Sequence, residues 1–426
     1  MKLKGLQLIF DILREKKQLK VVESPISEWK HHHKIAINKL KEKYNSGKKL
    51  KVAFLMMYAS STQDLPVFEK MLNSDRFDPY IIVHPDIMRS INNMEMNYRK
   101  TKEEMIKKYG QDRVFDGCTK DNYFDYTNDF DLMTTNSPYD EMAHPFFRIE
   151  YWYNKFIPIF YIGYFHMGRC RVAINNFKMP QFNMFWKFFA ENKHSKESAR
   201  IYQKIKDKNV VVTGYPKLDE IIKLKEQKRD RKKVIIAPHH TIDKGDVYMS
   251  GFLDYADILL KLPEKYSELD FVIRPHPMLI PKLEQPDYWG VEKTNEYFNK
   301  LLSFNNVSLS KEGNYYNLFV NSDGILHDCG SFTAEYLCTG HPAGYLNFRP
   351  ELNYDKAMTK FGQECIKKHY IIKTENDIYD FIDNIVLNNN DTRKEERMDF
   401  VNKELLINKS EVVNKIYDSI LKGIKD

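Results

Sequence analysis

The alternation of short apolar runs with longer amphipathic segments constrains the fold of this chain more than any other feature. The first cycle begins at Lys49, with an apolar run to Tyr58, a helical pattern over Thr62–Leu72 and a second apolar run over residues 77–85. A strand–helix–strand unit of this kind predicts a parallel sheet with a right-handed crossover. Further strands of the same sheet are predicted at residues 130–136, 156–164, 185–191 and 209–214.

A charged stretch without apolar periodicity, Leu224–Lys233, interrupts this alternation once. A second series follows, with strands predicted at residues 233–238, 270–277, 306–310, 324–328 and 342–347 and helices between them. We interpret the charged stretch as a solvated linker between two domains. The predicted fold class is therefore α/β of the GT-B type, in which two Rossmann-like domains face each other across a cleft.

The predicted organisation has three parts. Residues 1–48 form an N-terminal helical extension, residues 49–223 a first Rossmann-like domain, and residues 224–426 a second Rossmann-like domain with terminal helices. The length of 426 residues suits two domains, and 42% hydrophobic with 14% aromatic content excludes wholesale disorder.

The formal net charge of +7 arises from 66 basic and 59 acidic residues, without a dense basic stripe. We therefore expect no nucleic-acid partner, whereas phosphorylated ligands or an anionic membrane surface fit the mild excess. The five cysteines are scattered and form no CxxC pair, which is typical of a reducing compartment. A cytoplasmic protein is expected.

The first twenty residues can be wound as an amphipathic helix, with Leu6, Ile9, Phe10 and Leu13 on one face and lysines after them. This pattern has two interpretations. The helix is either a weak peripheral anchor on the inner face of the cell membrane or an accessory helix on the protein's own surface.

Polar residues directly after predicted strands should line the cleft, because the carboxyl ends of parallel strands meet at one edge of a sheet. His166 follows the strand at residues 156–164 and is a candidate general base, since neutral imidazole accepts a proton near pH 7. A histidine that merely satisfies a turn is the alternative. His239, His240 and Thr241 follow the strand at 233–238 and are expected to contact a phosphate. They lack metal-ligand spacing and a completing cysteine or carboxylate.

Two further groups lie after later strands. Arg274 and His276 stand in a rigid "RPHP" sequence, which suits a phosphate. Gly330 and Ser331 fall where a strand gives way to a helix, whose free N–H groups would seat an anion, and Glu335 lies one turn further on near an expected ribose. Alternatively, Ser331 is only a helix cap and Glu335 a first-turn charge.

Five motifs in this order, "YFHMG", "TGYPKLD", "IIAPHH", "IRPHP" and "HDCGSFTAEYL…HPAGYL", resemble the CDP-glycerol glycerophosphotransferase family over roughly residues 50–390. These GT-B enzymes build teichoic-acid-type and capsular polymers. The resemblance implies that His166 and His276 are the catalytic residues, the first as base and the second near the nucleotide phosphates. It also implies that Ser331 and Thr333 lie in a phosphate-binding turn and that Glu335 approaches the ribose.

The other positions expected at the substrates are Gly168, Arg169, His239, His240, Thr241, Arg274, Asp328, Gly330 and Phe332. The resemblance also makes residues 49–223 the acceptor-side domain and residues 224–426 the nucleotide-donor domain. The chain departs from the family pattern at three places: Met167 separates His166 from Gly168, Gly330 replaces one of two paired serines, and His239–His240–Thr241 replace a Thr-Trp-Arg-like stretch. These departures leave the donor open among CDP-glycerol, CDP-ribitol, another CDP-polyol and a nucleotide sugar.

The sequence therefore predicts a transferase that moves a polyol phosphate from a CDP-polyol to a hydroxyl of an acceptor. The expected acceptor is a glycan or a polymer, either free or linked to a lipid. CMP is released, and neither a cofactor nor a metal is expected. Three alternatives stay open: a GT-B glycosyltransferase that uses a nucleotide sugar, an epimerase-like enzyme of the same fold, and a nucleotide-binding assembly subunit without catalysis.

Overall fold

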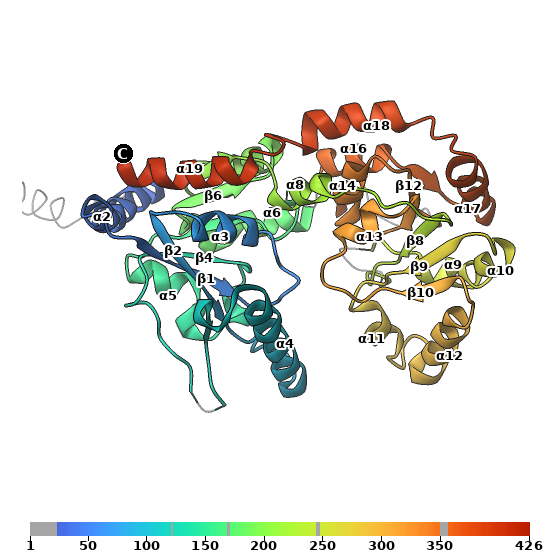
Figure 1. The fold of residues 1–426 in the computed structure, drawn as a ribbon, viewed down its shortest axis with the longest axis horizontal. Coiled ribbons are helices and arrows are strands. Elements are labelled where there is room, and N and C mark those ends of the chain that lie inside the picture. Colours follow the sequence, from blue (N-terminus) through green and yellow to red (C-terminus); the bar gives the residue numbers. More distant parts are fainter. Residues whose placement is uncertain (1–23, 121, 168–170, 244–247, 350–356) are drawn as a thin grey trace, which may run out of the picture.

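The computed structural model describes residues 24–120, 122–167, 171–243, 248–349 and 357–426. Within these residues the chain forms two halves, each built on a parallel sheet with helices on both faces (Figure 1). The α/β fold class predicted from the alternating pattern is therefore confirmed. The amphipathic pattern of the first twenty residues, and the candidates Gly168 and Arg169, lie outside the described residues.

The first half carries a sheet of order β3-β2-β1-β4, and a parallel bridge from Met133 to Ile159 joins it to a second group of order β5-β6-β7. The two faces of β1 enter different cores, because Val52 and Phe54 point to one side and Ala53 and Leu55 to the other. The strands are β1 (Leu50–Met56), β2 (Phe77–Val83), β3 (Val114–Asp116), β4 (Leu132–Thr135), β5 (Phe160–Ile162), β6 (Lys187–Ala190) and β7 (Val210–Val212).

The helices of the first half cover both faces of this sheet. The first of them, α2, is integrated into the half, because Ala36 and Leu40 are buried against it and Trp29 donates a hydrogen bond to the carbonyl of Phe185. The helices are α2 (Pro25–Asn45), α3 (Leu65–Leu72), α4 (Ile91–Tyr109), α5 (Ile149–Asn154), α6 (Arg171–Lys178) and α7 (Lys193–Tyr202). The next helix, α8 (Pro216–Lys223), packs into the core of the second half through Leu218 and Ile221.

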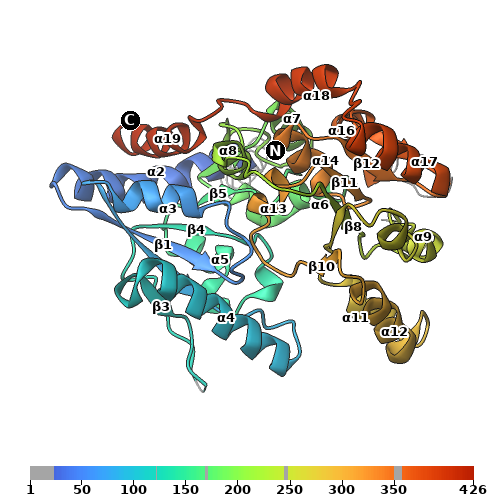
Figure 2. The same ribbon diagram turned by 45° about the vertical axis from the view of Figure 1, so that its right-hand side comes forward.

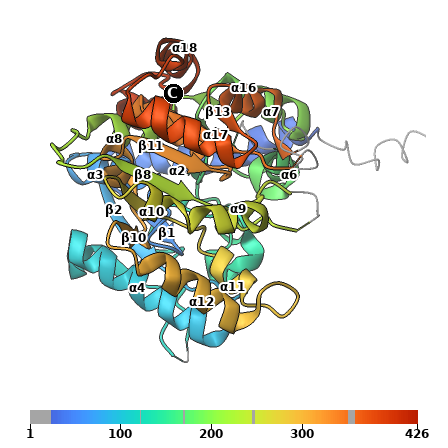
Figure 3. The same ribbon diagram turned by 90° about the vertical axis from the view of Figure 1, so that its right-hand side faces the viewer.

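The second half carries a sheet of order β10-β9-β8-β11-β12-β13, seen face-on in Figure 3. Val234 and Ile236 of β8 enter one core and Ile235 the opposite one, so both faces are covered as in a doubly wound fold. The strands are β8 (Lys233–Ala237), β9 (Asp270–Ile273), β10 (Val307–Leu309), β11 (Gly324–His327), β12 (Ala343–Leu346) and β13 (Tyr370–Ile372). The helices are α9 (Phe252–Leu259), α10 (Leu262–Lys265), α11 (Leu279–Leu283), α12 (Gly290–Leu302), α13 (Tyr316–Val320), α14 (Phe332–Glu335), α16 (Lys360–Lys367), α17 (Glu375–Asp380) and α18 (Lys394–Phe400).

The last helix, α19 (Val412–Lys425), returns to the first half (Figures 1 and 2). Its apolar stripe of Ile416, Ile420 and Ile424 is completely buried in the core that contains β1 and α3. A division of the chain at residue 224 therefore does not describe the last helix, which belongs by its packing to the first half. Local sequence pattern identifies this helix as amphipathic but does not say which sheet it covers.

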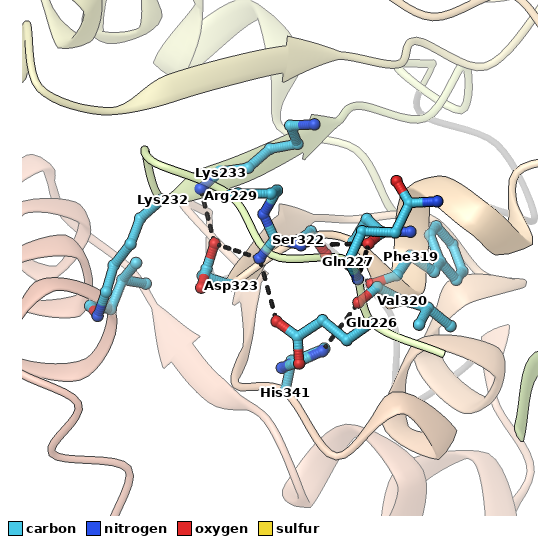
Figure 4. Close-up of polar contacts among 12 residues, drawn as sticks. Glu226, Gln227, Arg229, Lys232, Lys233, Phe319, Val320, Ser322, Asp323 and His341 are labelled. Carbon is cyan, nitrogen blue, oxygen red and sulfur yellow. Dashed lines mark hydrogen bonds and ion pairs between the residues drawn. The ribbon is translucent and has the colours of Figure 1, made fainter. Parts of the chain in front are cut away.

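The charged stretch Leu224–Lys233 is more ordered than the solvated linker that its composition indicates (Figure 4). Arg229 is paired with Asp323 at 2.9 Å, and the N–H of Gln227 donates to the Asn321 side chain at 2.7 Å. These contacts hold the residues just before β8 against the segment that precedes β11.

No helix in the described part of the chain is long and apolar enough to cross a membrane.

The docking of α19 gives a stability prediction. Ile420→Ala removes a completely buried side chain from the core shared with β1, so we expect the free energy of unfolding to fall by about 2–5 kcal/mol. Urea denaturation followed by circular dichroism measures this change. Asp418→Ala, at an exposed position of the same helix, should change it by less than about 0.5 kcal/mol. An Ile420→Ala protein as stable as wild type would contradict the assigned packing.

Candidate active site

The predicted site residues lie at the carboxyl ends of strands from both halves. In the first half, His166 follows β5 and Glu191 follows β6. In the second half, polar groups follow β8, β9 and β11, the three neighbouring strands at the centre of the sheet. The second half therefore gathers the predicted phosphate-binding residues at one edge, as the strand order requires.

His166 is completely buried and lies beside a buried carboxylate. Its Nδ1 is 3.5 Å from Oε1 of Glu191, and the same oxygen accepts a hydrogen bond of 2.6 Å from the hydroxyl of Ser195. A carboxylate next to Nδ1 favours a proton on that nitrogen and leaves Nε2 as the basic atom. This arrangement is compatible with a general base at His166, and it adds Glu191 as the residue that orients it.

A side chain of the second half covers His166. The ring of Phe361, on α16, lies 5.7 Å from the His166 ring and stacks at 4.3 Å on His194 of α7. Tyr215 approaches His166 from another side at 6.0 Å. These contacts leave His166 completely buried.

Three imidazoles converge in the second half. His239 and His240 follow β8, and His276 follows β9, with ring centroids 4.2 to 4.7 Å apart. The N–H of His276 donates to the carbonyl of Pro238 at 2.9 Å, which ties the two strand ends together. The Thr241 hydroxyl lies 2.9 Å from Nδ1 of His239. The sequence prediction that these residues share one site is therefore supported by their geometry.

Two of the three histidines, His240 and His276, are neutral near pH 7 in this arrangement. Burial, and then the charge of His240, lower the pKa of His276 to about 3, and burial together with Lys282 lowers the pKa of His240. His276 therefore offers hydrogen bonds rather than a positive charge. The cation nearby is Lys282, which donates to the carbonyl of His240 at 3.3 Å and pairs with Asp243.

The same three histidines could in principle hold a metal ion, since one nitrogen from each lies within 4.8 Å of the others. No metal was expected from the sequence, because His239 and His240 have no further ligand close by in the chain. His276, which completes the group, is distant in sequence. Two contacts favour an anion instead. The N–H of Met278 donates to Nδ1 of His276 at 3.1 Å, which leaves Nε2–H as a donor, and the ammonium of Lys282 stands beside His240.

Asp328 has a supporting position rather than a binding one. Its buried carboxylate accepts hydrogen bonds from the N–H of His239 at 2.7 Å, the Ser250 hydroxyl at 2.6 Å and the Tyr255 hydroxyl at 2.7 Å. Burial raises the pKa of Asp328 to about 6. The residue therefore fixes the loop that carries the first histidine, instead of pointing at a substrate.

The turn after β11 presents Gly330 and Ser331, which are half-buried, whereas Phe332 and Thr333 are buried. The Thr333 hydroxyl donates to the carbonyl of Gly330 at 2.7 Å, which closes the turn. The following α14 spans only four residues before the chain tightens into a 3₁₀ turn. A helix this short is a weak anion site, so the structure does not support anion binding at the helix N-terminus. The turn at Gly330 and Ser331 remains the candidate anion site.

Arg274 and Glu335 are both held by the protein. Arg274 donates to the Ser310 hydroxyl and to the carbonyl of Glu312, each at 2.8 Å, while its guanidinium lies over Tyr315. Glu335 is buried and accepts a hydrogen bond from the Tyr315 hydroxyl. The aromatic ring thus links two predicted ligand-binding residues, and Glu335 faces the protein interior rather than an open ribose site.

A buried charge cluster joins the two halves. Lys217, at the start of α8, is buried, which lowers its pKa, while the charges of Glu335 in the second half and Asp64 in the first raise it. Asp64 is also buried, and neither of its oxygens accepts a hydrogen bond from another of the described residues. Neither Asp64 nor Lys217 was predicted as a site residue. The only sequence signal was position, since Asp64 follows β1 and Lys217 stands within "GYPKLD".

Comparison with known proteins gives the fold. No protein-family model matches the sequence, and no curated protein matches it significantly. Solved structures do match. UDP-GlcNAc 2-epimerase from Neisseria meningitidis, bound to UDP-GlcNAc, has a TM-score of 0.57 at 17% identity and covers 88% of this chain and 100% of its own. The S. aureus MnaA–UDP structure has a TM-score of 0.54 at 14% identity, over 88% of this chain and 96% of its own.

The wall teichoic acid polymerase TagF, in its H444N variant, matches with a TM-score of 0.54 at 13% identity and covers 99% of this chain and 98% of its own. The class of protein is therefore α/β with the GT-B fold, as predicted. The polymerase builds the kind of polymer that the sequence resemblance names, and it shares the fold with this chain over almost all its length.

The buried carboxylate of Asp64 gives a pH-dependent prediction. Burial raises its pKa from 3.8 to about 7, so the folded state holds this proton more tightly than the unfolded chain does. The contribution of Asp64 to stability is therefore greatest below pH 4 and is lost as the pH rises towards 7. We expect Asp64→Asn to stabilise the protein at pH 8 by about 1–4 kcal/mol and to change little at pH 4.

Urea denaturation of wild type and Asp64→Asn at both pH values measures this difference. Asp75→Asn, at an exposed position shortly after α3, is the control and should be neutral at both. An equal effect of Asp64→Asn at pH 4 and pH 8 would contradict the raised pKa of the buried Asp64 carboxylate.

Proposed function

We propose that the protein transfers a polyol phosphate, with glycerol phosphate as the first candidate, from a CDP-polyol to a hydroxyl of a glycan or polymer acceptor. The main observation behind the proposal is that the two halves hold different kinds of candidate site residue. The first half holds the His166–Glu191 pair, and the second half gathers neutral imidazole donors and a Gly330–Ser331 turn at three strand ends. A base on one half and a phosphate site on the other suit transfer between two substrates.

In the proposed reaction the acceptor oxygen attacks the β-phosphorus of the donor. A new P–O bond to the acceptor forms as the bond between the β-phosphorus and the bridging oxygen breaks. CMP leaves with that oxygen and its electron pair, and Nε2 of His166 takes the acceptor proton. The negative charge on the phosphoryl oxygens requires donors and positioning more than covalent chemistry.

Two observations support the proposal. The wall teichoic acid polymerase TagF shares the fold over 99% of this chain. The motifs that resemble the glycerophosphotransferase family lie at the strand ends described above. The second candidate is a GT-B glycosyltransferase, which the nucleotide-sugar-bound neighbour favours. It would attack a sugar carbon and release a nucleoside diphosphate, so the identity of the released nucleotide separates the two reactions.

The base assignment predicts a large effect of one substitution. We expect His166→Ala to lower turnover by about 10²–10⁴-fold, because a general base contributes that factor, while CMP binding stays unchanged. CMP release from CDP-glycerol, with a short glycerol-phosphate oligomer as acceptor, measures turnover. His194→Ala removes another imidazole that stacks on Phe361 and is the matched control. Turnover of His166→Ala close to that of His194→Ala would rule out His166 as the base.

The nucleotide preference is a second prediction. Calorimetric titration with CMP, CDP-glycerol, UMP and UDP-GlcNAc should show selective binding of the cytidine nucleotides. Ser331→Ala should weaken that binding about tenfold, since a hydrogen bond to a charged group contributes about 1.5 kcal/mol or more. Selective binding of the uridine nucleotides would instead favour the glycosyltransferase.

A further inference from the structure

The segment that carries Glu191 buries three polar side chains at the point where β6 ends and α7 begins. Glu191, Asn192 and Ser195 are each at most 2% exposed. Polar side chains with so little exposure are uncommon in proteins unless they hydrogen-bond to other groups of the chain. Their contacts therefore indicate their roles.

Asn192 is the N-cap of α7, a helix of ten residues. Its side-chain oxygen accepts hydrogen bonds of 3.0 Å from the N–H groups of His194 and Ser195. An asparagine in this position satisfies N–H groups that have no partner within the helix. The carboxylate of Glu191 is therefore not needed as a cap.

Ser195 acts on that carboxylate instead. Its hydroxyl donates a hydrogen bond of 2.6 Å to Oε1 of Glu191, the oxygen that lies 3.5 Å from Nδ1 of His166. Burial penalises an ionised carboxylate, and a hydrogen bond to the charged form offsets part of this cost. Glu191 directly precedes the N-cap, so the positive end of the α7 dipole also lies close to it. Both features favour an ionised Glu191.

The basic side chains of the same turn are paired with another carboxylate. Lys193 lies 2.9 Å from Oε1 of Glu404, and Nε2 of His194 lies 3.3 Å from Oε2 of that residue. Among the described residues, the ion-pair partner of Glu191 is His166. The charge of Glu191 therefore acts on the imidazole of the candidate base.

A neutral imidazole carries its proton on either nitrogen, and only the form protonated on Nδ1 offers Nε2 as a base. An ionised carboxylate beside Nδ1 stabilises that form. The rings of Tyr215 and Phe361 pack on the His166 ring with centroids 6.0 and 5.7 Å away, and neither offers Nδ1 a charged partner. The contact with Glu191 therefore selects the tautomer.

We propose that Ser195 is a positioning residue, which acts on His166 through Glu191. Its hydroxyl keeps the carboxylate ionised and directed at Nδ1, so that His166 presents an unprotonated Nε2. The effect on turnover rests on the proposed function, in which Nε2 takes the acceptor proton. The choice of tautomer does not depend on that function.

Kinetics of the full-length protein with CDP-glycerol and a glycerol-phosphate oligomer give the first test. We expect Ser195→Ala to lower kcat about tenfold to hundredfold at unchanged KM for CDP-glycerol, because a hydrogen bond to a charged group contributes such a factor. Ser195→Thr keeps the hydroxyl and should recover most of the lost turnover. Ser322→Ala removes an equally buried hydroxyl in the second half and is the matched control, with unchanged kcat.

A second measurement determines the tautomer and needs no turnover. Long-range proton–nitrogen NMR of protein with isotope-labelled histidine shows which ring nitrogen carries the proton, with the His166 signals assigned from their loss in His166→Ala. We expect a proton on Nδ1 in wild type and in Ser195→Thr, and a mixture of both tautomers in Ser195→Ala. Ser195→Cys fills the same space with a weaker donor and replaces Ser195→Ala if that variant does not fold.

Two outcomes would overturn the proposal. The same tautomer in wild type and Ser195→Ala would show that the hydroxyl does not act on His166 through Glu191. An equal loss of kcat in Ser195→Ala and Ser322→Ala would make the effect a general one of destabilisation. A wild-type tautomer that Ser195→Ala loses, in a protein that releases no CMP from CDP-glycerol, would support the role of Ser195 and contradict the proposed function instead.

Discussion

The relative position of the two halves depends on one small junction where the chain crosses between them twice. Asp219, in the first turns of α8, accepts hydrogen bonds from the N–H groups of Ser410 and Val412, so the outgoing crossing fixes the start of the returning helix α19. Gly214 has a φ of +95°, and a Cβ there would lie 2.2 Å from the carbonyl oxygen of Ile407. Only glycine allows the two crossings to lie this close. Packing of the two chain crossings therefore accounts for Gly214 and Asp219 of "GYPKLD" without a role in binding.

This junction also determines the electrostatics of the cleft. Lys217 lies in the same motif, and its charge acts on Asp64 in one half and Glu335 in the other. His166 is covered by Phe361 from the second half. His166, Lys217 and Asp64 are therefore buried where the two halves meet.

The sequence predicted the parts of the fold that depend on local pattern. Five of the six strands of the second half were predicted, because continuous apolar runs such as Val234–Ala237 are typical of parallel strands buried on both faces. Strands β3 and β13 were missed, since each has three residues with only one of them buried, Val114 and Ile372. The placement of α19 could not be predicted, because it depends on contacts between segments far apart in the chain. Asp328 was assigned to the ligand for the same reason: a strand-end carboxylate has the same sequence context whether it faces a substrate or a loop.

The GT-B fold by itself does not choose between an epimerase and a transferase. The candidate base His166 belongs to the half opposite the histidine group, and Phe361 of the second half covers its ring. A base that is buried in this way cannot activate bulk water. Access to it therefore requires that Phe361 leave the His166 ring.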